Sequence, residues 1–538
     1  MDIDRKADVE HIDAPIRDGE KVTTATGAAV VESAYANLSR WQIVKTFWLA
    51  IVFAAVATFG SLTDGYEFAV VFELTRASVT AGILANQGFI NKFGLTNAAG
   101  EKFLGATMIS LWGGLLSVTT FLGQIIAGWS NDVIGRKGNM YIFTAFFIIG
   151  VTLECVSKDW KMWLAAKTLF GCGLGMVQVT MTTYISEIAP TQVRGALLAL
   201  YSLGFALGQF ASSIALQVIQ TTDPLNWLRA VYTQWIFIGL WIIGMVFLPE
   251  SPWHLARQKK VEQAKKSMKR IYGHVAGYDV EREFLVLATE IEHAEFIREE
   301  MQGHKIVEIF RGVNLRRTLA STFPIVLQQL CGVPIFFSYL TYFFQMAGLK
   351  DPFVASVIMY VLLLAGIIIS FWTTERIGRR PLLLYGCVIM FIANIGLGLS
   401  GSFTITSSAL NASLAMSCIW VFTYAMSAAP IGFVVAAETA TPRLKSLTTG
   451  FAIGCYGALN VVFQFTVPLM LAADGANWGV KAAYLFAGLT VFGALGIFFF
   501  TPETSGRTFS EMDELFELRI SPRHFAKTQT TAQKAGIL

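Results

Sequence analysis

The chain has 538 residues, a formal net charge of +4 and only 14% charged residues. A soluble protein carries roughly 25% charged residues, whereas 54% of this chain is hydrophobic. The small net charge, with no basic stripe interleaved with aromatic residues, gives no support for nucleic acid binding. The apolar excess therefore predicts an all-α membrane protein whose solvent is the lipid bilayer.

Twelve apolar segments follow a polar N-terminal stretch. Residues 1–45 lack the apolar core of a cleavable signal peptide, so we expect them to form a cytoplasmic tail. Each later segment has about 20 residues, the length of a helix that crosses a bilayer. The expected transmembrane helices are residues 46–71, 105–128, 139–157, 161–185, 193–217, 231–249, 317–347, 353–373, 381–401, 410–437, 446–472 and 481–501.

A polar middle separates six of these helices from the other six. Residues 250–317 hold 13 Lys or Arg and 11 Asp or Glu, and 259–272 and 281–302 have the pattern of amphipathic surface helices. The sequence thus predicts two six-helix lobes joined by a cytoplasmic bridge. The expected domains are an N-terminal tail at 1–45, lobes at 46–249 and 317–501, the bridge at 250–316 and a C-terminal tail at 502–538.

Lys and Arg in the short loops predict the orientation of the chain. Arg136, Arg194, Arg379 and Arg443 fall on the same side of the membrane as the bridge, and the opposite loops carry fewer bases. We therefore expect both termini in the cytoplasm. The six cysteines lie mostly inside apolar segments without CxxC spacing, which predicts buried thiols and no disulfide framework or metal site.

Two loops of the first lobe recur in the second. An acid, a glycine and paired bases stand at 132–137 and again at 375–380, and an acid precedes an Arg at 187–194 and again at 438–443. Carboxylates at helix ends that meet Arg from neighbouring loops would form a charge latch, which lobe movement would break. Topology signals alone would explain the bases but not the acids. The predicted latch residues are Asp132, Arg136, Glu187, Arg194, Glu375, Arg379, Glu438 and Arg443.

Further motifs resemble the sugar porter family of the major facilitator superfamily. Pro249-Glu250-Ser251-Pro252 follows the sixth helix, Gln328-Gln329-Leu330-Cys331-Gly332 lies in the seventh, and Pro502-Glu503-Thr504 with Gly506-Arg507-Thr508 follows the twelfth. The resemblance covers residues 46–517. It implies the major facilitator fold: twelve transmembrane helices in two six-helix pseudo-repeated lobes that rock around a central site.

Within this family the chain looks most like the fungal maltose and α-glucoside permeases. Residues 341–349, Gln178 with 182–184, and 477–481 carry this narrower likeness. It implies a plasma-membrane transporter of fungal type for an α-glucoside or related disaccharide.

Amide side chains within the expected helices are candidates for sugar binding. An amide offers a donor and an acceptor to a pair of sugar hydroxyl groups. The family resemblance implies this role for Gln328, Gln329 and Gln209, and it suggests Asn460 as a further partner. The alternative is that such amides join neighbouring helices by hydrogen bonds.

Aromatic residues are candidates for stacking on the apolar face of a sugar ring. Phe433 stands where relatives carry Trp or Tyr, and the alternatives are Phe336, Phe337 and Tyr339. Such residues equally serve as core in membrane helices. The chain also has Pro334 where many hexose porters have Asn, and Ser338 in place of an aromatic residue, which indicates a substrate other than a simple hexose or a lost site.

Two acids in the first helix are candidates for proton coupling. A charged carboxylate at the centre of a membrane helix costs roughly 2.5–3.5 kcal/mol on insertion scales, and protonation removes that charge. In family symporters an acid in the position of Glu67 carries the proton, and Asp64 is the second candidate. Lys167, where many relatives have Arg, is the expected counter-ion. A permanent Glu67–Lys167 pair would instead be structural.

The sequence therefore predicts a monomeric, proton-coupled sugar transporter that works by alternating access and needs no cofactor or metal. A facilitative uniporter and a non-transporting sugar receptor stay open as alternatives. An enzyme is not expected, because four of the six histidines lie in the bridge and the opposite loops carry no His/Asp/Glu cluster, metal-ligand spacing or nucleophile motif.

Overall fold

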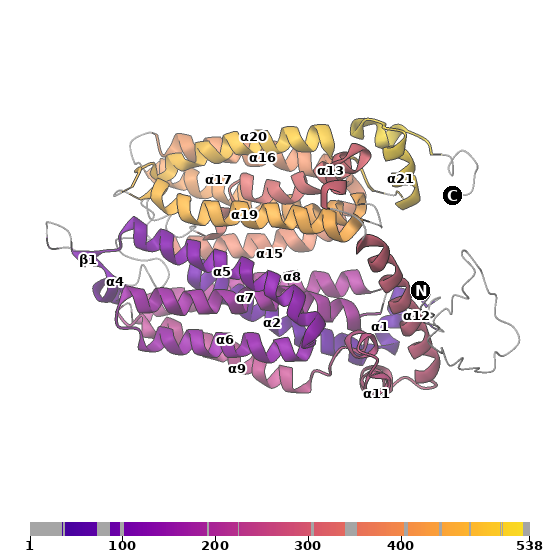
Figure 1. Cartoon of the computed structure of the whole chain (residues 1–538). Coiled ribbons are helices and arrows are strands. Elements are labelled where there is room, and N and C mark those ends of the chain that lie inside the picture. Colours follow the sequence, from indigo (N-terminus) through magenta and orange to yellow (C-terminus); the bar gives the residue numbers. More distant parts are fainter. Residues whose placement is uncertain are drawn as a thin grey trace, which may run out of the picture.

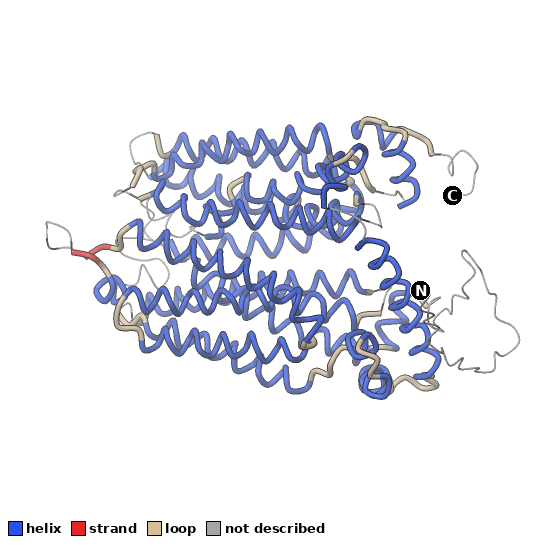
Figure 2. Tube along the Cα trace, viewed as in Figure 1, coloured by secondary structure: helices blue, strands red, loops and turns tan. Residues whose placement is uncertain are grey.

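The chain is almost entirely helical in the part that the structure describes (Figure 2). Ten of its helices are long and apolar enough to cross a membrane, and a further apolar stretch, Val354–Ser370, is shorter. The predicted all-α membrane fold class is therefore confirmed. The computed structural model describes residues 35, 38–72, 87–96, 100, 102–190, 193–223, 225–302, 306–338, 352–402, 407–440, 444–472, 475–505, 507 and 509–530.

The first half of the chain forms one bundle, the lower layer in Figure 1. In this bundle α2 packs along α8, and α7 packs against both α5 and α6. Glycines allow the close approach of α2 and α8, since a Cβ at Gly65 would lie 1.9 Å from the carbonyl oxygen of Phe205. The long helices are α2 (Trp48–Phe72), α5 (Ala106–Val133), α6 (Arg136–Val156), α7 (Trp160–Ile188), α8 (Arg194–Thr222) and α9 (Leu228–Phe247).

The second half forms the upper layer in Figure 1. Its first helix, α13, ends where Gly332 adopts a φ of +116°, and Pro334 then begins the π-helical turn η2. Proline lacks a backbone N–H and so does not continue a regular α-helix. The π-helical turn η2 (Pro334–Ser338) follows α13, and the 3-10 turn η4 (Gly479–Ala482) precedes α20. The helices are α13 (Gly312–Leu330), α15 (Pro352–Ile377), α16 (Arg379–Ser400), α17 (Ser407–Met426), α18 (Ala428–Thr439), α19 (Lys445–Leu471) and α20 (Ala483–Phe500).

In the described part of the chain the two lobes meet mainly where α5 packs on α19, α8 on α15, and α2 on η2. Glycines again permit the contact. A Cβ at Gly114 would lie 2.3 Å from the ring of Phe465, and one at Gly457 would lie 2.8 Å from the ring of Phe121. The rings therefore fill the space that these glycines leave.

The polar middle folds at one end of the bundle, which we call the bridge end. It forms α10 (Pro252–Arg257), α11 (Val261–Tyr272), α12 (Val280–Gln302) and the 3-10 turn η1 (Ile306–Phe310). Met268, Leu287 and Ile291 bury a small core between these helices. The short helix α1 (Arg40–Thr46) lies at the same end, and Figure 1 shows α1, α11 and α12 grouped there.

The segment after α20, expected only as a tail, is folded against the second lobe. It forms α21 (Phe509–Glu517) and the 3-10 turn η5 (Pro522–Lys527). Leu515, Phe516 and Phe525 pack with Ala320 of α13. Arg317 of α13 forms an ion pair with Asp513.

The end opposite the bridge carries structure that the sequence did not predict. The short helix α4 (Gln87–Phe93) precedes a hairpin of β1 (Leu95–Thr96) and β2 (Lys102–Phe103), at the left of Figure 1. Phe89 contacts the rings of Trp112, Trp163 and Trp227. This aromatic cluster closes the first lobe at that end.

Candidate functional site

A polar network converges on Asp64, one of the two predicted proton carriers. Asp64 is fully buried in α2, and its two carboxylate oxygens accept hydrogen bonds from Gln178 of α7 (3.2 Å) and Tyr201 of α8 (3.3 Å). Gln178 in turn accepts one from Gln124 of α5 at 2.8 Å. Gln124, Gln178 and Tyr201 are half-buried, so the network links a fully buried acid to half-buried amide groups. None of these three was predicted as a site residue, although Gln178 was noted as part of the likeness to maltose permeases.

The predicted counter-ion pairs with a different acid. The Lys167 ammonium lies 2.6 Å from the Glu154 carboxylate of α6, and among the described residues it forms no ion pair with Glu67. Gln234 of α9 donates a hydrogen bond of 3.1 Å to the other oxygen of Glu154. Glu67 is fully buried, and neither of its carboxylate oxygens has a hydrogen-bond partner among the described residues. The expected Glu67–Lys167 pair is therefore absent from this structure.

The predicted amides are all buried inside the bundle. Gln209 of α8 is 3% exposed, and Gln328 and Gln329 of α13 are 3% and 1% exposed. These values exclude a position on the outer surface, where lipid would contact them. Gln328 and Gln329 are sequence neighbours on α13 of the second lobe, whereas Gln209 lies on α8 of the first lobe.

Two tyrosines accompany the α13 amides. Tyr424 of α17 donates a hydrogen bond of 3.1 Å to the side-chain oxygen of Gln328, whose amide nitrogen has no partner among the described residues. The Gln329 side chain lies beside the hydroxyl of Tyr456, without a hydrogen bond of good geometry among the described residues. Both amides thus keep buried polar atoms without a hydrogen-bond partner among the described residues.

Glycine makes room for one of these amides. A Cβ at Gly432 of α18 would lie 2.8 Å from the Gln328 amide nitrogen, and the next residue, Phe433, has a ring that is 48% exposed. Asn460 of α19 is half-buried and accepts a hydrogen bond of 3.5 Å from Gln464.

The alternative rings are less available. Phe336 is fully buried and stacks on Trp420, and Phe337 packs on Tyr424. Tyr339 lies outside the described residues. Phe433 is thus the most exposed of the predicted rings among the described residues.

At the bridge end, Arg136 is the centre of the predicted latch in the first lobe. Its guanidinium forms an ion pair with Glu187 and donates to the Asn131 carbonyl oxygen at 2.8 Å. Asp132 lies 4.0 Å from Arg136 and 2.9 Å from Arg257 of α10. Arg194 forms no ion pair within the described part of the chain.

Two residues after α9 complete this corner. The Glu250 carboxylate accepts hydrogen bonds from the backbone N–H groups of Arg136 and Lys137, at 3.1 Å each, and so caps α6. Burial raises the pKa of Glu250, although these backbone donors oppose the shift. His254 packs its ring nitrogen 3.1 Å from Arg136. Burial, reinforced by the Arg136 charge, lowers the pKa of His254 from 6.5 to about 4.

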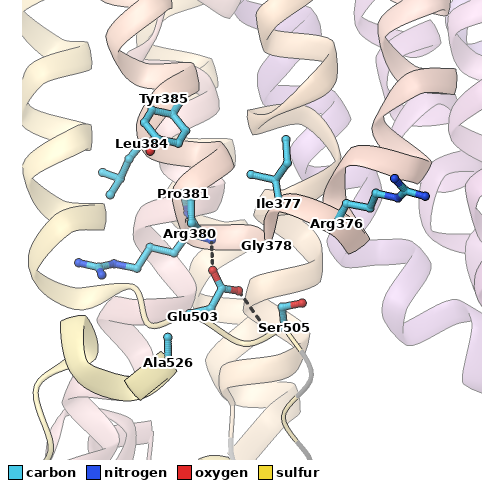
Figure 3. Close-up of a pocket in the computed structure, with 10 residues that line it drawn as sticks. All are labelled: Arg376, Ile377, Gly378, Arg380, Pro381, Leu384, Tyr385, Glu503, Ser505 and Ala526. Carbon is cyan, nitrogen blue, oxygen red and sulfur yellow. Dashed lines mark hydrogen bonds between the residues drawn. The ribbon is translucent and has the colours of Figure 1, made fainter. Parts of the chain in front are cut away.

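The second lobe repeats this corner with different residues. Arg379 bonds Glu438 at 3.2 Å and the Ser505 hydroxyl at 3.0 Å. Glu503 accepts hydrogen bonds from the backbone of Arg379 (3.0 Å) and Arg380 (3.1 Å), and Figure 3 shows it at the start of α16 beside a surface pocket of about 450 Å³. The Glu375 side chain and Arg443 lie outside the described residues.

The glycine before each Arg explains why the two corners are alike. Gly135 and Gly378 have φ angles of +97° and +93°, which an L side chain rarely adopts. A Cβ at Gly135 would lie 2.6 Å from Glu250, and one at Gly378 would lie 2.7 Å from Glu503. The ion pairs of these corners join elements of one lobe, or join the first lobe to helix α10 of the bridge, and none of them joins the two lobes, so rigid-body rocking of the lobes would leave these pairs intact. The expectation that lobe movement breaks them does not follow from this placement.

Comparison with known proteins agrees with this architecture. A family model described as "Sugar (and other) transporter" matches residues 53–516. Hexose transporter HXT10 of Saccharomyces cerevisiae is 26% identical over 522 residues, which cover 94% of this chain and 91% of the relative. The MFS transporter fmqE of Aspergillus fumigatus is 28% identical over 542 residues, which cover 99% of each chain.

Solved structures show the same fold. The inward-open xylose transporter XylE of E. coli matches with a TM-score of 0.69 at 19% identity, covering 87% of this chain and 99% of XylE. The proton:xylose symporter XylE bound to 6-bromo-6-deoxy-D-glucose matches with a TM-score of 0.64 at 19% identity, covering 88% of this chain and 99% of XylE. The narrower likeness to maltose permeases stays a prediction, since the named relatives do not carry it. The family model, which spans most of both lobes, shows that the chain belongs to the sugar (and other) transporter family, as a multi-pass membrane transporter with the major facilitator fold.

Proposed function

We propose that this chain is a proton-coupled sugar transporter that works by alternating access. The observation that carries the proposal is the contact between Asp64 and Gln178, which joins a fully buried carboxyl group to half-buried amides. Amides suit sugar hydroxyl groups, and a carboxyl group within a membrane helix becomes neutral when it takes up a proton. Sugar binding and protonation would then act on one hydrogen-bond network.

The proposed sugar site uses side chains of both lobes. Gln209 contributes from the first lobe, and Gln328 and Gln329 from the second, because all three are buried amides inside the bundle. Phe433 offers its exposed ring to the apolar face of the sugar. Asn460 and, on the family resemblance alone, Tyr339 complete the proposed set.

Glu67 is the first proposed proton carrier and Asp64 the second, with Lys167 as the neighbouring cation. Glu67 is buried without a hydrogen-bond partner among the described residues, which favours its neutral form. Both acids lie on α2, the helix that contacts the second lobe through η2.

For gating, we propose two roles among the predicted latch residues. Asp132, Arg136, Glu187, Arg379 and Glu438 stiffen each lobe, so that it moves as a unit. Arg194, Glu375 and Arg443 are the candidates for contacts between lobes. We place the protein in the plasma membrane as a monomer, with both termini in the cytoplasm, because the bases of the bridge end follow the positive-inside rule.

The substrate class is a pyranose sugar. The sequence likeness favours an α-glucoside or related disaccharide, whereas the relatives are named as hexose transporters. The structure of XylE with a bromodeoxyglucose supports a hexopyranose ring as the common element. Maltose and glucose are therefore the two sugars that the first experiment compares.

Transport by the purified protein in liposomes tests the proposal. An inwardly directed proton gradient should drive labelled maltose or glucose above its equilibrium level, with alkalinisation outside. Glu67→Gln and Asp64→Asn should reduce this accumulation at least about tenfold, while Glu290→Gln, a change of an exposed acid in the bridge, should not. Equilibration without proton movement would identify a uniporter, and sugar binding without uptake would identify a receptor; either result would overturn the proposal.

A further inference from the structure

Three carboxyl groups and one ammonium group lie buried together in the first lobe. Asp64, Glu67 and Glu154 are 0% exposed, and Lys167 is 1% exposed. The charges of Lys167, Glu154 and Asp64 all act on Glu67. This cluster therefore holds one positive charge for three acids.

Lys167 forms an ion pair with Glu154 in this conformation, although its ammonium nitrogen makes no hydrogen bond of good geometry among the described residues. Its ammonium lies 2.6 Å from one Glu154 oxygen, while Gln234 donates to the other. The rings of Trp163 and Phe170 flank the ammonium, with centroids 4.9 Å and 5.9 Å away. Glu154 thus has a cation beside one oxygen and a hydrogen-bond donor on the other, and both favour its ionised form.

Among the described residues, Glu67 has neither a cation in an ion pair nor a hydrogen-bond donor. Both of its oxygens are buried without a hydrogen bond, whereas Asp64 accepts one on each oxygen. An ionised carboxylate in such a position would keep its full desolvation penalty. Protonation of Glu67 removes that penalty and leaves Lys167 and Glu154 as an oppositely charged pair, while Asp64 has the hydrogen-bond donors Gln178 and Tyr201.

We propose that Glu154 is a positioning residue that competes with Glu67 for Lys167 and thereby keeps Glu67 protonated in this conformation. When Glu67 gives its proton to water, Lys167 is shared between the two carboxylates, and Gln234 stays on Glu154. The long side chain of Lys167 allows this exchange because α7 packs against both α6 and α2. The inference deepens the proposed proton coupling and depends on it only for the transport measurement below.

Chemical labelling tests the assignment without transport. Dicyclohexylcarbodiimide reacts with protonated carboxyl groups in apolar sites, and mass spectrometry of the purified full-length protein locates the adduct. In the unaltered protein we expect the label on Glu67 and not on Glu154. Glu154→Gln frees Lys167 to pair with Glu67, so labelling of Glu67 should fall on the order of tenfold. Unchanged labelling of Glu67 in this variant would overturn the proposal.

Further variants separate a positioning role from a structural one. Glu154→Asp keeps the charge and should restore most of the labelling of Glu67. Lys167→Met removes the cation, so Glu154 should become labelled while Glu67 stays labelled, and an unlabelled Glu154 here would contradict the proposal. This second variant keeps the inference testable if Glu154→Gln does not fold, as judged by size-exclusion chromatography and thermal unfolding.

Transport provides an independent readout. Glu154→Gln should move the pH at which proton-driven uptake declines to a lower value, by about one unit, with a smaller change in the KM for sugar. If labelling behaves as expected and no proton-driven uptake occurs, the proposed function fails and the role of Glu154 stands. If uptake is proton-driven and neither the labelling nor the pH profile responds to Glu154→Gln, the role of Glu154 fails.

Discussion

Gln328, one of the proposed sugar-binding amides, has one of its two polar atoms paired and the other unpaired in the described part of the chain. Tyr424 binds its oxygen, and its amide nitrogen stays unpaired among the described residues. A hydrogen bond is worth about 0.5–1.5 kcal/mol in net terms, so we expect Gln328→Ala to weaken sugar binding about three- to tenfold. Tyr424→Phe, which releases the amide orientation, should have a smaller effect.

Equilibrium binding of labelled sugar to the purified protein measures both changes. Gln263→Ala, which removes an exposed amide on α11, is the matched control and should leave the affinity unchanged. Equal affinities of Gln328→Ala and the unaltered protein would show that Gln328 does not contribute to sugar binding.

His254 makes the corner at Arg136 sensitive to acid. The pKa of its ring is lowered from 6.5 to about 4, so between these values the unfolded chain binds more protons than the folded one. Stability is then fully present above pH 6.5 and is lost as the pH falls towards 4. We expect the unaltered protein to lose on the order of 1–2 kcal/mol across this window relative to His254→Gln.

Thermal unfolding of the purified protein at a series of pH values checks this expectation. His274→Gln, which changes an exposed histidine of the bridge, serves as the control and should follow the unaltered protein. Parallel pH profiles for His254→Gln and the unaltered protein would contradict the assignment.

Sequence reasoning at the residue scale found the acids and amides but not their partners. Lys167 was expected beside Glu67, yet it binds Glu154, because the rotation of α6 against α7 decides which acid it meets. A lone acid near the end of an apolar helix carries no motif. Glu250 and Glu503 were noted as parts of family motifs, but their capping role depends on the turns at Gly135 and Gly378, which only the backbone shows.

Among the elements, α5 and α19 make the contact most sensitive to side-chain size. Gly114 faces the ring of Phe465, so Gly114→Ala forces that ring to move and should cost about 1–3 kcal/mol. Gly128→Ala on the same helix meets nothing within 4 Å and should instead stabilise α5 by up to about 1 kcal/mol.

Thermal unfolding of both variants measures the difference, and the double variant Gly114→Ala with Phe465→Ala should recover part of the loss. Equal midpoints for the two glycine variants would show that the α5–α19 contact is looser than described.

The helices themselves could be predicted largely from the length and composition of the apolar segments. Each of the twelve predicted segments overlaps a helix of the structure, with residues 339–347 of the seventh outside the described part. The break at Pro334 follows from the missing N–H of proline. By contrast, α4 and the β1–β2 hairpin were missed because seven helical residues and two-residue strands are too short to show a period.

At the scale of the whole molecule, we expect the equivalent corners of the two lobes to stabilise the fold independently of each other. Glu187→Gln weakens the pair with Arg136 in one lobe, and Glu438→Gln weakens the pair with Arg379 in the other. Each change should cost about 1–2 kcal/mol, since both acids are mostly buried and bind a charged partner. Because the corners share no residue, we expect the two costs to add within about 0.5 kcal/mol.

Denaturation of the two single variants and the double variant in the same detergent gives these values. A coupling clearly larger than that margin would mean that the corners sense one another through the lobe interface, contrary to their placement within single lobes.

The folded segment after α20 has a practical consequence for work with this protein. Arg507 donates hydrogen bonds to the carbonyl oxygens of Phe525 and Thr528, and Glu511 accepts one from Thr530. A purification tag or fluorescent reporter joined beyond Thr530 would leave this packing intact. A shortened chain that stops before Phe509 would instead expose Ala320 and Arg317, and we expect it to aggregate and to express poorly.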